Sequence, residues 1–196
     1  MDALTRLAVA ARDGDPAALD AFLDAAYVPV HRLCRALAGP TDGPDLAQEA
    51  VVRVVRALPG YGGDAPATAW VLRIARNVCI DAHRSRARRA RLAGQLASER
   101  GRRVPASATG PEGAVVLAGL LAHLDTDRRD ALVLTRWVGL SYAEAADVLG
   151  VPVGTVRSRV ARGRAELAAL LADDDADRTP GAGAPRGVAP AVDEAG

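Results

Sequence analysis

Residues 141–171 read SYAEAADVLGVPVGTVRSRVARGRAELAALL, and this stretch decides the fold of the C-terminal half. Ser141 and Glu144 have the spacing of a capping box, in which each side chain binds a free backbone N–H at a helix start. Gly150 suits a left-handed helix end, and Pro152 prevents the first helix from continuing. The stretch therefore predicts two helices joined by a tight turn, over 141–149 and 153–171.

This pair predicts a helix-turn-helix, whose second helix normally enters the DNA major groove. At about 100° per residue, one arc of that helix is apolar and should face the core: Val156, Val160, Leu167 and Leu171. The opposite arc carries arginines and small residues: Arg157, Ser158, Ala161, Arg162 and Ala165. Arginine offers a rigid fork of donors that matches guanine edges or phosphate. We therefore interpret this arc as a DNA contact rather than as a solvated face.

The composition of the 196 residues favours helices, because aromatic residues are only 3% and alternating β-branched runs are absent. All 25 basic residues are arginine. The net charge of +1 hides an uneven distribution: residues 1–95 carry thirteen arginines against ten acids, and residues 173–196 carry two against six. The part expected to fold is thus mildly basic, as a nucleic-acid binder requires.

The N-terminal half also predicts helices. The first covers Leu4–Arg12, and a second begins after Asp15 and reaches about Ala38, with an optional break at Pro29. Residues 39–43 are turn material, and a third helix begins at Pro44 or Asp45 and ends at Ala57. A fourth begins at Trp70 and continues to about Leu92.

The fourth helix carries a second basic surface. Five polar residues fall within about 60° of arc on it: Arg73, Asn77, Arg84, Arg88 and Arg91. Its apolar side is formed by Trp70, Val71, Ile74, Val78 and Ala82. Such a stripe suits a track of phosphates, and it lies apart from the helix-turn-helix.

The third helix presents a mixed face of Asp45, Gln48, Glu49, Val52 and Arg56, while Leu46, Ala50, Val54 and Leu58 point inward. Val52 is an exposed apolar residue among charged neighbours, which is compatible with a protein-docking patch or with a plain surface.

The chain therefore divides into two small helical domains, all-α, at 1–93 and 114–172. Residues 94–113 lose apolar periodicity and are expected to form a flexible linker. In the second domain, helices are also expected over 114–124 and 126–138. The acidic tail 173–196 is expected to be disordered.

These pieces together resemble the extracytoplasmic-function (ECF) sigma factors, the small two-domain branch of the sigma-70 family. PDLAQEAVVRVVRAL at 44–58 resembles region 2.2, which docks on the clamp helices of RNA polymerase. TAWVLRIARNVCIDAHRSRARR at 68–89 resembles regions 2.3 and 2.4, which read and open the promoter −10 element. Residues 124–167 resemble region 4, whose last helix reads the −35 element. The likeness covers nearly everything from Asp15 to Leu171.

The resemblance implies an alternative sigma factor that binds core RNA polymerase and promoter DNA in the cytoplasm, without membrane insertion. It also implies roles for individual residues. Those engaging the polymerase would be Asp45, Gln48, Glu49 and Val52. Those contacting the −10 element would be Arg73, Ile74 and Asn77, with Arg84 and Arg88 on the DNA backbone. Those at the −35 element would be Arg157, Ser158 and Arg162, with Thr155 holding a phosphate.

Two further points follow from the resemblance. Members of the family are often held inactive by an anti-sigma factor, although no residue here identifies one. The loop GYGGDAPATAW at 60–70, which in the family forms a pocket for a flipped base, holds mostly small residues and lacks a long side chain near Ala67. With little aromatic surface to offset unstacking, the free protein is expected to bind a promoter weakly.

The sequence shows no pattern of an enzyme. It has no Gly-rich phosphate loop, no Ser/His/Asp arrangement and no paired carboxylates in a plausible cleft, so we expect no catalysis and no cofactor. It also shows no signal peptide and no apolar stretch long enough to span a bilayer, so we expect a soluble, cytoplasmic protein. His31 with Cys34 and Cys79 with His83 could form two halves of a zinc site, but buried apolar cysteines are the favoured interpretation, with no metal bound.

Two competing functions remain. A stand-alone helix-turn-helix regulator would use 141–171 alone, with 1–95 as a dimerisation or sensing domain. The stripe on the fourth helix and the docking face on the third argue against it. An RNA-binding protein is a weaker alternative because exposed aromatics for stacking are scarce.

Overall fold

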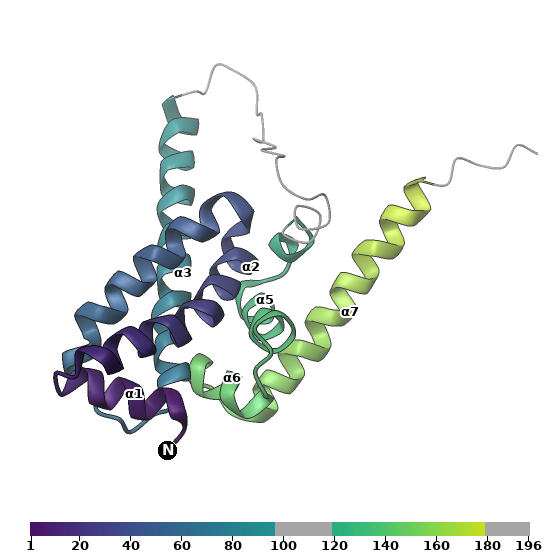
Figure 1. Ribbon diagram of the computed structural model, residues 1–196. Coiled ribbons are helices and arrows are strands. Elements are labelled where there is room, and N and C mark those ends of the chain that lie inside the picture. The colour runs from purple at the N-terminus through teal and green to yellow at the C-terminus, as the bar shows by residue number, and fades with distance from the viewer. Residues whose placement is uncertain (97–118, 179–196) are drawn as a thin grey trace, which may run out of the picture.

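The computed structural model describes residues 1–96 and 119–178 (Figure 1), and every regular element in them is helical. The N-terminal unit comprises α1 (Ala3–Arg12), α2 (Pro16–Ala57), the short 3-10 helix η1 (Leu58–Gly60) and α3 (Ala67–Leu96). The C-terminal unit comprises α5 (Thr126–Val133), η2 (Leu134–Val138), α6 (Tyr142–Leu149) and α7 (Val153–Arg178), preceded by helical residues at 119–123. The all-α prediction with two helical units is confirmed.

Side-chain caps begin the first two helices. The Asp2 carboxylate accepts from the Thr5 backbone N–H at the start of α1, and Asp15 accepts from the N–H groups of Ala17 and Ala18 at the start of α2. These bonds satisfy donors that have no partner within the first helical turn. The α1 boundaries match the prediction to within one residue.

The expected turn at 39–43 is wrong in extent, because only Gly39 leaves the helical conformation, with φ 82° and ψ 177°. The chain bends sharply at this residue and resumes helical geometry at Pro40, several residues earlier than expected. Pro29 lies inside the helix without breaking it. At Gly43 the two arms of α2 are so close that a Cβ would lie 2.6 Å from the Cα of Arg35.

The C-terminal unit follows the local sequence signals closely. Ser141 Oγ accepts from the Glu144 N–H, and the Glu144 carboxylate accepts from the Ser141 N–H, so the capping box is confirmed. Gly150 ends α6 with φ 66°. The helix expected over 126–138 is present, but its last five residues form a π-helix that ends at Gly139.

The end of α7 differs from the prediction. Val156 and Val160 are buried as expected, but Leu171 is 49% exposed because α7 extends beyond the elements that it packs against (Figure 1). The helix continues to Arg178, so the first residues of the expected tail are helical. α3 likewise continues past the expected end to Leu96. The rest of the predicted linker and tail, 97–113 and 179–196, lies outside the described residues.

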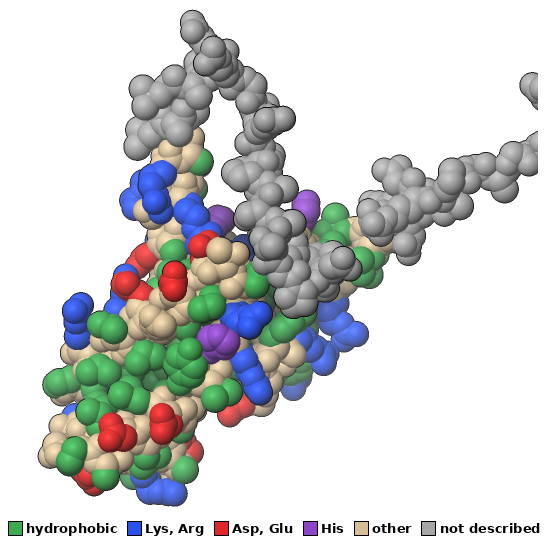
Figure 2. All heavy atoms as spheres, turned by 45° about the horizontal axis from the view of Figure 1, so that its top comes forward, with side chains coloured by type: hydrophobic (Ala, Val, Ile, Leu, Met, Phe, Trp, Pro, Cys, Tyr) green, Lys and Arg blue, Asp and Glu red, His purple; other side chains and the backbone are tan. Residues whose placement is uncertain are grey.

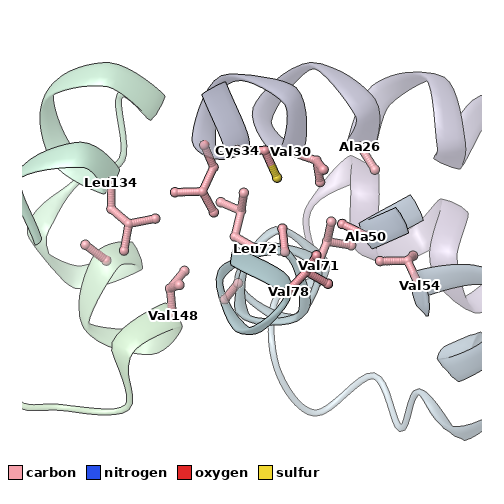
Figure 3. Packing of buried hydrophobic residues seen from close by; sticks show 14 of the residues in the cluster. Ala26, Val30, Cys34, Ala50, Val54, Val71, Leu72, Val78, Leu134 and Val148 are labelled. Carbon is pink, nitrogen blue, oxygen red and sulfur yellow. The ribbon is translucent and has the colours of Figure 1, made fainter. Parts of the chain in front are cut away.

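The two units pack against each other. α3 contacts α6, and α2 contacts α5 and η2. Figure 3 shows Leu72 of α3 directed toward Leu134 and Val148 of the C-terminal unit, and all three side chains are buried. Among the described residues, no helix is long and apolar enough to cross a membrane.

Candidate nucleic-acid interface

The arginine stripe of α3 is a real surface feature. Arg73, Asn77, Arg84 and Arg88 are all exposed, while Ile74 is half-buried against the core. Figure 2 shows basic side chains gathered along the part of α3 that leads toward residue 96. The helix is held from beneath by buried side chains, Val71, Leu72, Ala75 and Val78 among them. A rigid helix therefore presents guanidinium groups and one amide along a single face.

One end of this stripe is engaged by the C-terminal unit. The Arg73 guanidinium donates a hydrogen bond to the backbone carbonyl of Asp147, near the end of α6. One turn further along α3, Arg76 forms an ion pair with Asp130 of α5, with Nε and Oδ2 2.5 Å apart. Arg76 lies outside the stripe expected from the helical wheel, and its side chain joins the two units.

Asp130 is a buried carboxylate at the interface between the units. It is 1% exposed, and its Oδ1 atom has no hydrogen-bond partner. Burial raises the pKa of Asp130, and the nearby Arg76 guanidinium opposes that shift. The sequence carries no sign of this role beyond a single acid before the apolar run ALVL, so Asp130 was not among the predicted residues. Its charge is compensated chiefly by a side chain from the other unit.

The loop between η1 and α3 is tightly held. The Tyr61 hydroxyl donates to the Ala65 carbonyl, and the centroids of the Tyr61 and Trp70 rings are 4.8 Å apart. Arg12 donates to the Tyr61 carbonyl at 2.9 Å, and the buried Ala67 N–H donates to Thr5 Oγ1 at 2.9 Å. Because Tyr61 packs inward, this aromatic ring is not available to stack on a flipped base.

The helix-turn-helix lies opposite this loop. A cleft of about 510 Å³ separates them, lined on one side by Asp64, Pro66 and Arg73 and on the other by Asp147, Gly150 and Pro152, among others. Arg73 of the α3 stripe thus lies in this cleft, opposite the end of α6 and the turn that follows it.

The outer arc of α7 is largely free of the core. Arg157 and Arg162 are exposed, and the Arg157 guanidinium lies over the Tyr142 ring, 6.0 Å from its centroid. Thr155 and Ser158 are half-buried, and the Ser158 hydroxyl donates to the Thr155 carbonyl at 2.9 Å. The two arginines are therefore presented to a ligand, while the Ser158 hydroxyl bonds within its own helix.

The predicted docking face on the second arm of α2 is exposed. Asp45, Gln48, Glu49 and Val52 all lie at the surface, and Val52 is 47% exposed. Val55, which the sequence analysis did not single out, adds a second exposed apolar side chain to this arm.

Two exposed ion pairs share Arg53 on this arm of α2. Arg53 bonds Glu49 at 2.9 Å and Asp81 of α3 at 3.2 Å, which ties the face to the basic helix. The described residues contain no group of three His, Cys, Asp or Glu side chains that could hold a metal ion.

Two family descriptions match this chain, in the order of its units. Sigma-70 region 2 matches residues 23–89, and Sigma-70, region 4 matches residues 115–167. The first match includes the α2 docking face and most of the α3 stripe, and the second includes the helix-turn-helix.

Similar proteins cover the chain almost from end to end. The ECF RNA polymerase sigma factor SigC of Mycobacterium tuberculosis is 41% identical over 176 residues, which are 90% of this chain and 94% of that protein. The solved structure of CnrH, a sigma factor of Cupriavidus metallidurans, in complex with the cytosolic domain of CnrY has a TM-score of 0.67 and 34% identity, covering 88% of this chain and 99% of CnrH. The sigma factor RpoE of Bartonella quintana, solved with the anti-sigma factor NepR, has a TM-score of 0.62 and 25% identity over 80% of this chain and 98% of RpoE.

Proposed function

This chain belongs to the ECF branch of the sigma-70 family, and we propose that its two helical units divide promoter recognition between them. As an alternative sigma factor it directs promoter-specific transcription initiation. The observation that supports the division of labour is the exposure of basic residues on one face of α3 and, separately, on the outer arc of α7. In this proposal the chain performs no catalysis of its own and acts in the cytoplasm, together with core RNA polymerase.

The α3 stripe binds the −10 element in this proposal. Arg73, Ile74 and Asn77 contact the unpaired strand, and Arg84 and Arg88 bind phosphates further along the helix. Guanidinium groups suit both tasks, because they pair with base edges and with phosphate oxygens. Since Tyr61 is buried, binding of the melted strand depends on hydrogen bonds and charge more than on stacking.

The outer arc of α7 reads the −35 element in the major groove. Arg157 and Arg162 supply the base-edge or phosphate contacts, and Thr155 at the helix N-terminus is placed to hold a phosphate. The Ser158 hydroxyl already donates its proton within the helix. It can therefore accept a hydrogen bond from DNA, or donate one after rotating away from the Thr155 carbonyl.

Core RNA polymerase binds the second arm of α2 in this proposal. Asp45, Gln48 and Glu49 lie on the same exposed face as the apolar Val52. The polar side chains would give specificity, and Val52 would contribute apolar area buried on binding. The complexes of CnrH with CnrY and of RpoE with the anti-sigma factor NepR support an anti-sigma factor as a further partner.

The packed arrangement of the two units is a resting form in this proposal. Arg73 is held by the Asp147 carbonyl, and the loop between η1 and α3 faces the turn between α6 and α7 across the cleft described above. Promoter binding requires these surfaces to separate, so the free chain binds a promoter weakly until polymerase holds the units apart.

Co-elution with purified core RNA polymerase tests the docking face. We expect Asp45→Arg combined with Val52→Glu to abolish co-elution in gel filtration, because the substitutions reverse a charge and remove apolar area. Asp20→Arg is the matched control, since Asp20 is an exposed acid on the first arm of the same helix. Equal binding by both variants would contradict the proposed face, and a free chain that binds duplex promoter tightly without polymerase would favour a stand-alone regulator.

A further inference from the structure

The first residue of α3 receives its hydrogen-bond acceptor from a distant helix. Ala67 is fully buried, and its N–H is one of those at a helix start that have no partner within the helix. The preceding residue, Pro66, accepts from the Trp70 N–H at 3.1 Å but has no polar side chain that could act as a cap. The acceptor comes instead from α1, where Thr5 Oγ1 lies 2.9 Å from the Ala67 nitrogen. A side chain of α1 therefore fixes where α3 begins.

A carboxylate sets the direction of the Thr5 hydroxyl. Thr5 is 3% exposed, and its hydroxyl donates to Asp2 Oδ2 at 2.7 Å. Asp2 Oδ1 accepts from the Thr5 N–H at 2.9 Å, so the carboxylate holds this residue at two atoms. Because the hydroxyl proton points toward Asp2, the oxygen lone pairs are free to accept from Ala67. Capping of α1 requires only the bond to the Thr5 N–H, so the buried hydroxyl serves the start of α3.

The same helix also holds the loop 61–66, which joins η1 to α3 and runs beside α1 (Figure 1). At the start of the loop, Arg12 Nη1 donates to the Tyr61 carbonyl at 2.9 Å. In its middle, Gly63 has a φ of 81°, and a Cβ added there would lie 3.5 Å from Val9 Cγ2 of α1. Together with the bond at the start of α3, these contacts brace the loop along its whole length.

The braced loop borders the cleft that contains Arg73. Asp64, Ala65 and Pro66 line this cleft together with Arg73. These three side chains are short, so a group that binds beside Arg73 meets backbone atoms and one carboxylate rather than long, adaptable side chains. Hydrogen bonds weaken steeply when their distance and angle depart from the optimum. Selection by such a loop therefore depends on where its backbone is held.

We propose that Thr5 and Arg12 are positioning residues, which set base selectivity at the −10 element by fixing the loop 61–66 and the first turn of α3. No contact with DNA is required of either side chain. The inference rests on the proposed function, in which Arg73 and its neighbours on α3 bind the unpaired −10 strand. It adds that base reading there depends on α1, which carries none of the proposed DNA contacts.

The test measures base preference with holoenzyme reconstituted from core RNA polymerase and the full-length chain. The wild-type holoenzyme first selects a promoter from a randomised pool. Two barcoded template pools are then transcribed, one randomised at the −10 element of that promoter and the other at its −35 element. Thr5→Val keeps the shape of the side chain but removes the acceptor for the Ala67 N–H. It should weaken −10 preference about five-fold, the effect of one lost hydrogen bond, and leave −35 preference unchanged.

Conservative and matched variants separate positioning from a general loss of structure. Thr5→Ser keeps the hydroxyl and should retain the −10 preference of the wild type. Arg12→Met removes the donor to the Tyr61 carbonyl and should also weaken −10 preference. Arg6→Met is its control, because Arg6 is an exposed arginine on the same helix that donates to the Met1 carbonyl instead.

Two further measurements test the structural basis. Asp15→Ala removes the side-chain cap of α2 in the same unit, so it controls for a loss of stability and should retain −10 preference. Amide exchange of the free full-length chain, followed by NMR, reports on the Ala67 N–H directly. Exchange at this amide should be faster in Thr5→Val than in Thr5→Ser, because its acceptor is missing.

The possible failures can be told apart. If Thr5→Val and Arg12→Met both retain the wild-type −10 preference, this inference is overturned and the proposed function stands. Equal losses at the −10 and −35 elements, or an equal loss in Asp15→Ala, would also overturn it, since they would indicate a general loss of structure. A wild-type holoenzyme without base preference in the −10 pool would overturn the proposed function and this inference with it. If Thr5→Val does not fold, Arg12→Met and Arg6→Met supply the comparison.

Discussion

Replacing Arg76 by Ala should separate the two helical units without touching a proposed DNA contact. Arg76 is the side chain that α3 offers to the buried Asp130 carboxylate, and its removal leaves that charge 1% exposed and unpaired in the packed form. When the units separate, water can reach the carboxylate. The substitution therefore penalises the packed form more than the separated one.

The size of the penalty can be bounded. Removing one partner of a buried ion pair costs about 3–5 kcal/mol. Protonation of the Asp130 carboxyl sets an upper limit on this cost. Protonating a carboxyl with an ordinary pKa of 3.8 at pH 7 costs about 1.4 kcal/mol per pH unit, or about 4 kcal/mol in total, and a larger penalty would be avoided by taking up the proton. A penalty of about 3 kcal/mol shifts the equilibrium toward separation about 100-fold.

Small-angle X-ray scattering of the free protein measures this shift as an increase in radius of gyration. Anisotropy with a labelled single-stranded oligonucleotide should show tighter binding as Arg73 is released. The matched control is Arg86→Ala, which also removes one α3 arginine but breaks only an exposed pair with Asp42 within the N-terminal unit. Such a pair contributes at most about 1 kcal/mol.

The pH dependence gives a second readout of the same substitution. Burial raises the pKa of Asp130, so the packed form holds the proton more tightly than the separated form. In Arg76→Ala, lowering the pH through that raised pKa should therefore restore packing, and raising it should open the protein. Adding Asp130→Asn should restore packing at neutral pH, because it removes the unpaired charge. A radius of gyration and an oligonucleotide affinity of Arg76→Ala equal to those of Arg86→Ala would show that this ion pair does not hold the units together.

Two further substitutions test the packing of the C-terminal unit. Gly163→Ala would place a Cβ 2.6 Å from the buried Leu132 Cδ1, so we expect calorimetry to show a free energy of unfolding lower by about 1–3 kcal/mol. The control Gly154→Ala has open space around its Cβ and should not destabilise the protein. Equal melting temperatures of the two variants would contradict this packing. Ser141→Ala removes the acceptor for the Glu144 N–H and should lower the free energy of unfolding by about 1 kcal/mol in urea, and an unchanged midpoint would show that the capping box contributes nothing.

Local features of the fold could be predicted because single residues determine them. The capping box and the left-handed glycine at the end of α6 depend on side chains and backbone within one helical turn, and both are where the sequence places them. The exposed stripe on α3 follows from helical periodicity alone. The position of the bend in α2 is harder to predict, because Gly39, Pro40 and Gly43 all permit a turn and tertiary packing selects one of them.

Contacts between the units could not be predicted in this way. Leu72 is fully buried although the wheel did not assign it to the apolar side, because it packs toward the second unit rather than within its own. Asp130 and Arg76 lie 54 residues apart, and no periodic pattern links them.

If α3 and α7 act together at one promoter, run-off transcription by a reconstituted holoenzyme should depend on both helices. The double variant Arg73→Ala/Arg157→Ala removes one exposed arginine from each proposed surface, and Arg6→Ala/Arg164→Ala removes two other exposed arginines as a control of equal charge. At about 1–3 kcal/mol for each base contact, the first variant should lose at least ~30-fold in initiation while still co-eluting with core polymerase. Transcription equal to that of the control variant would contradict the account.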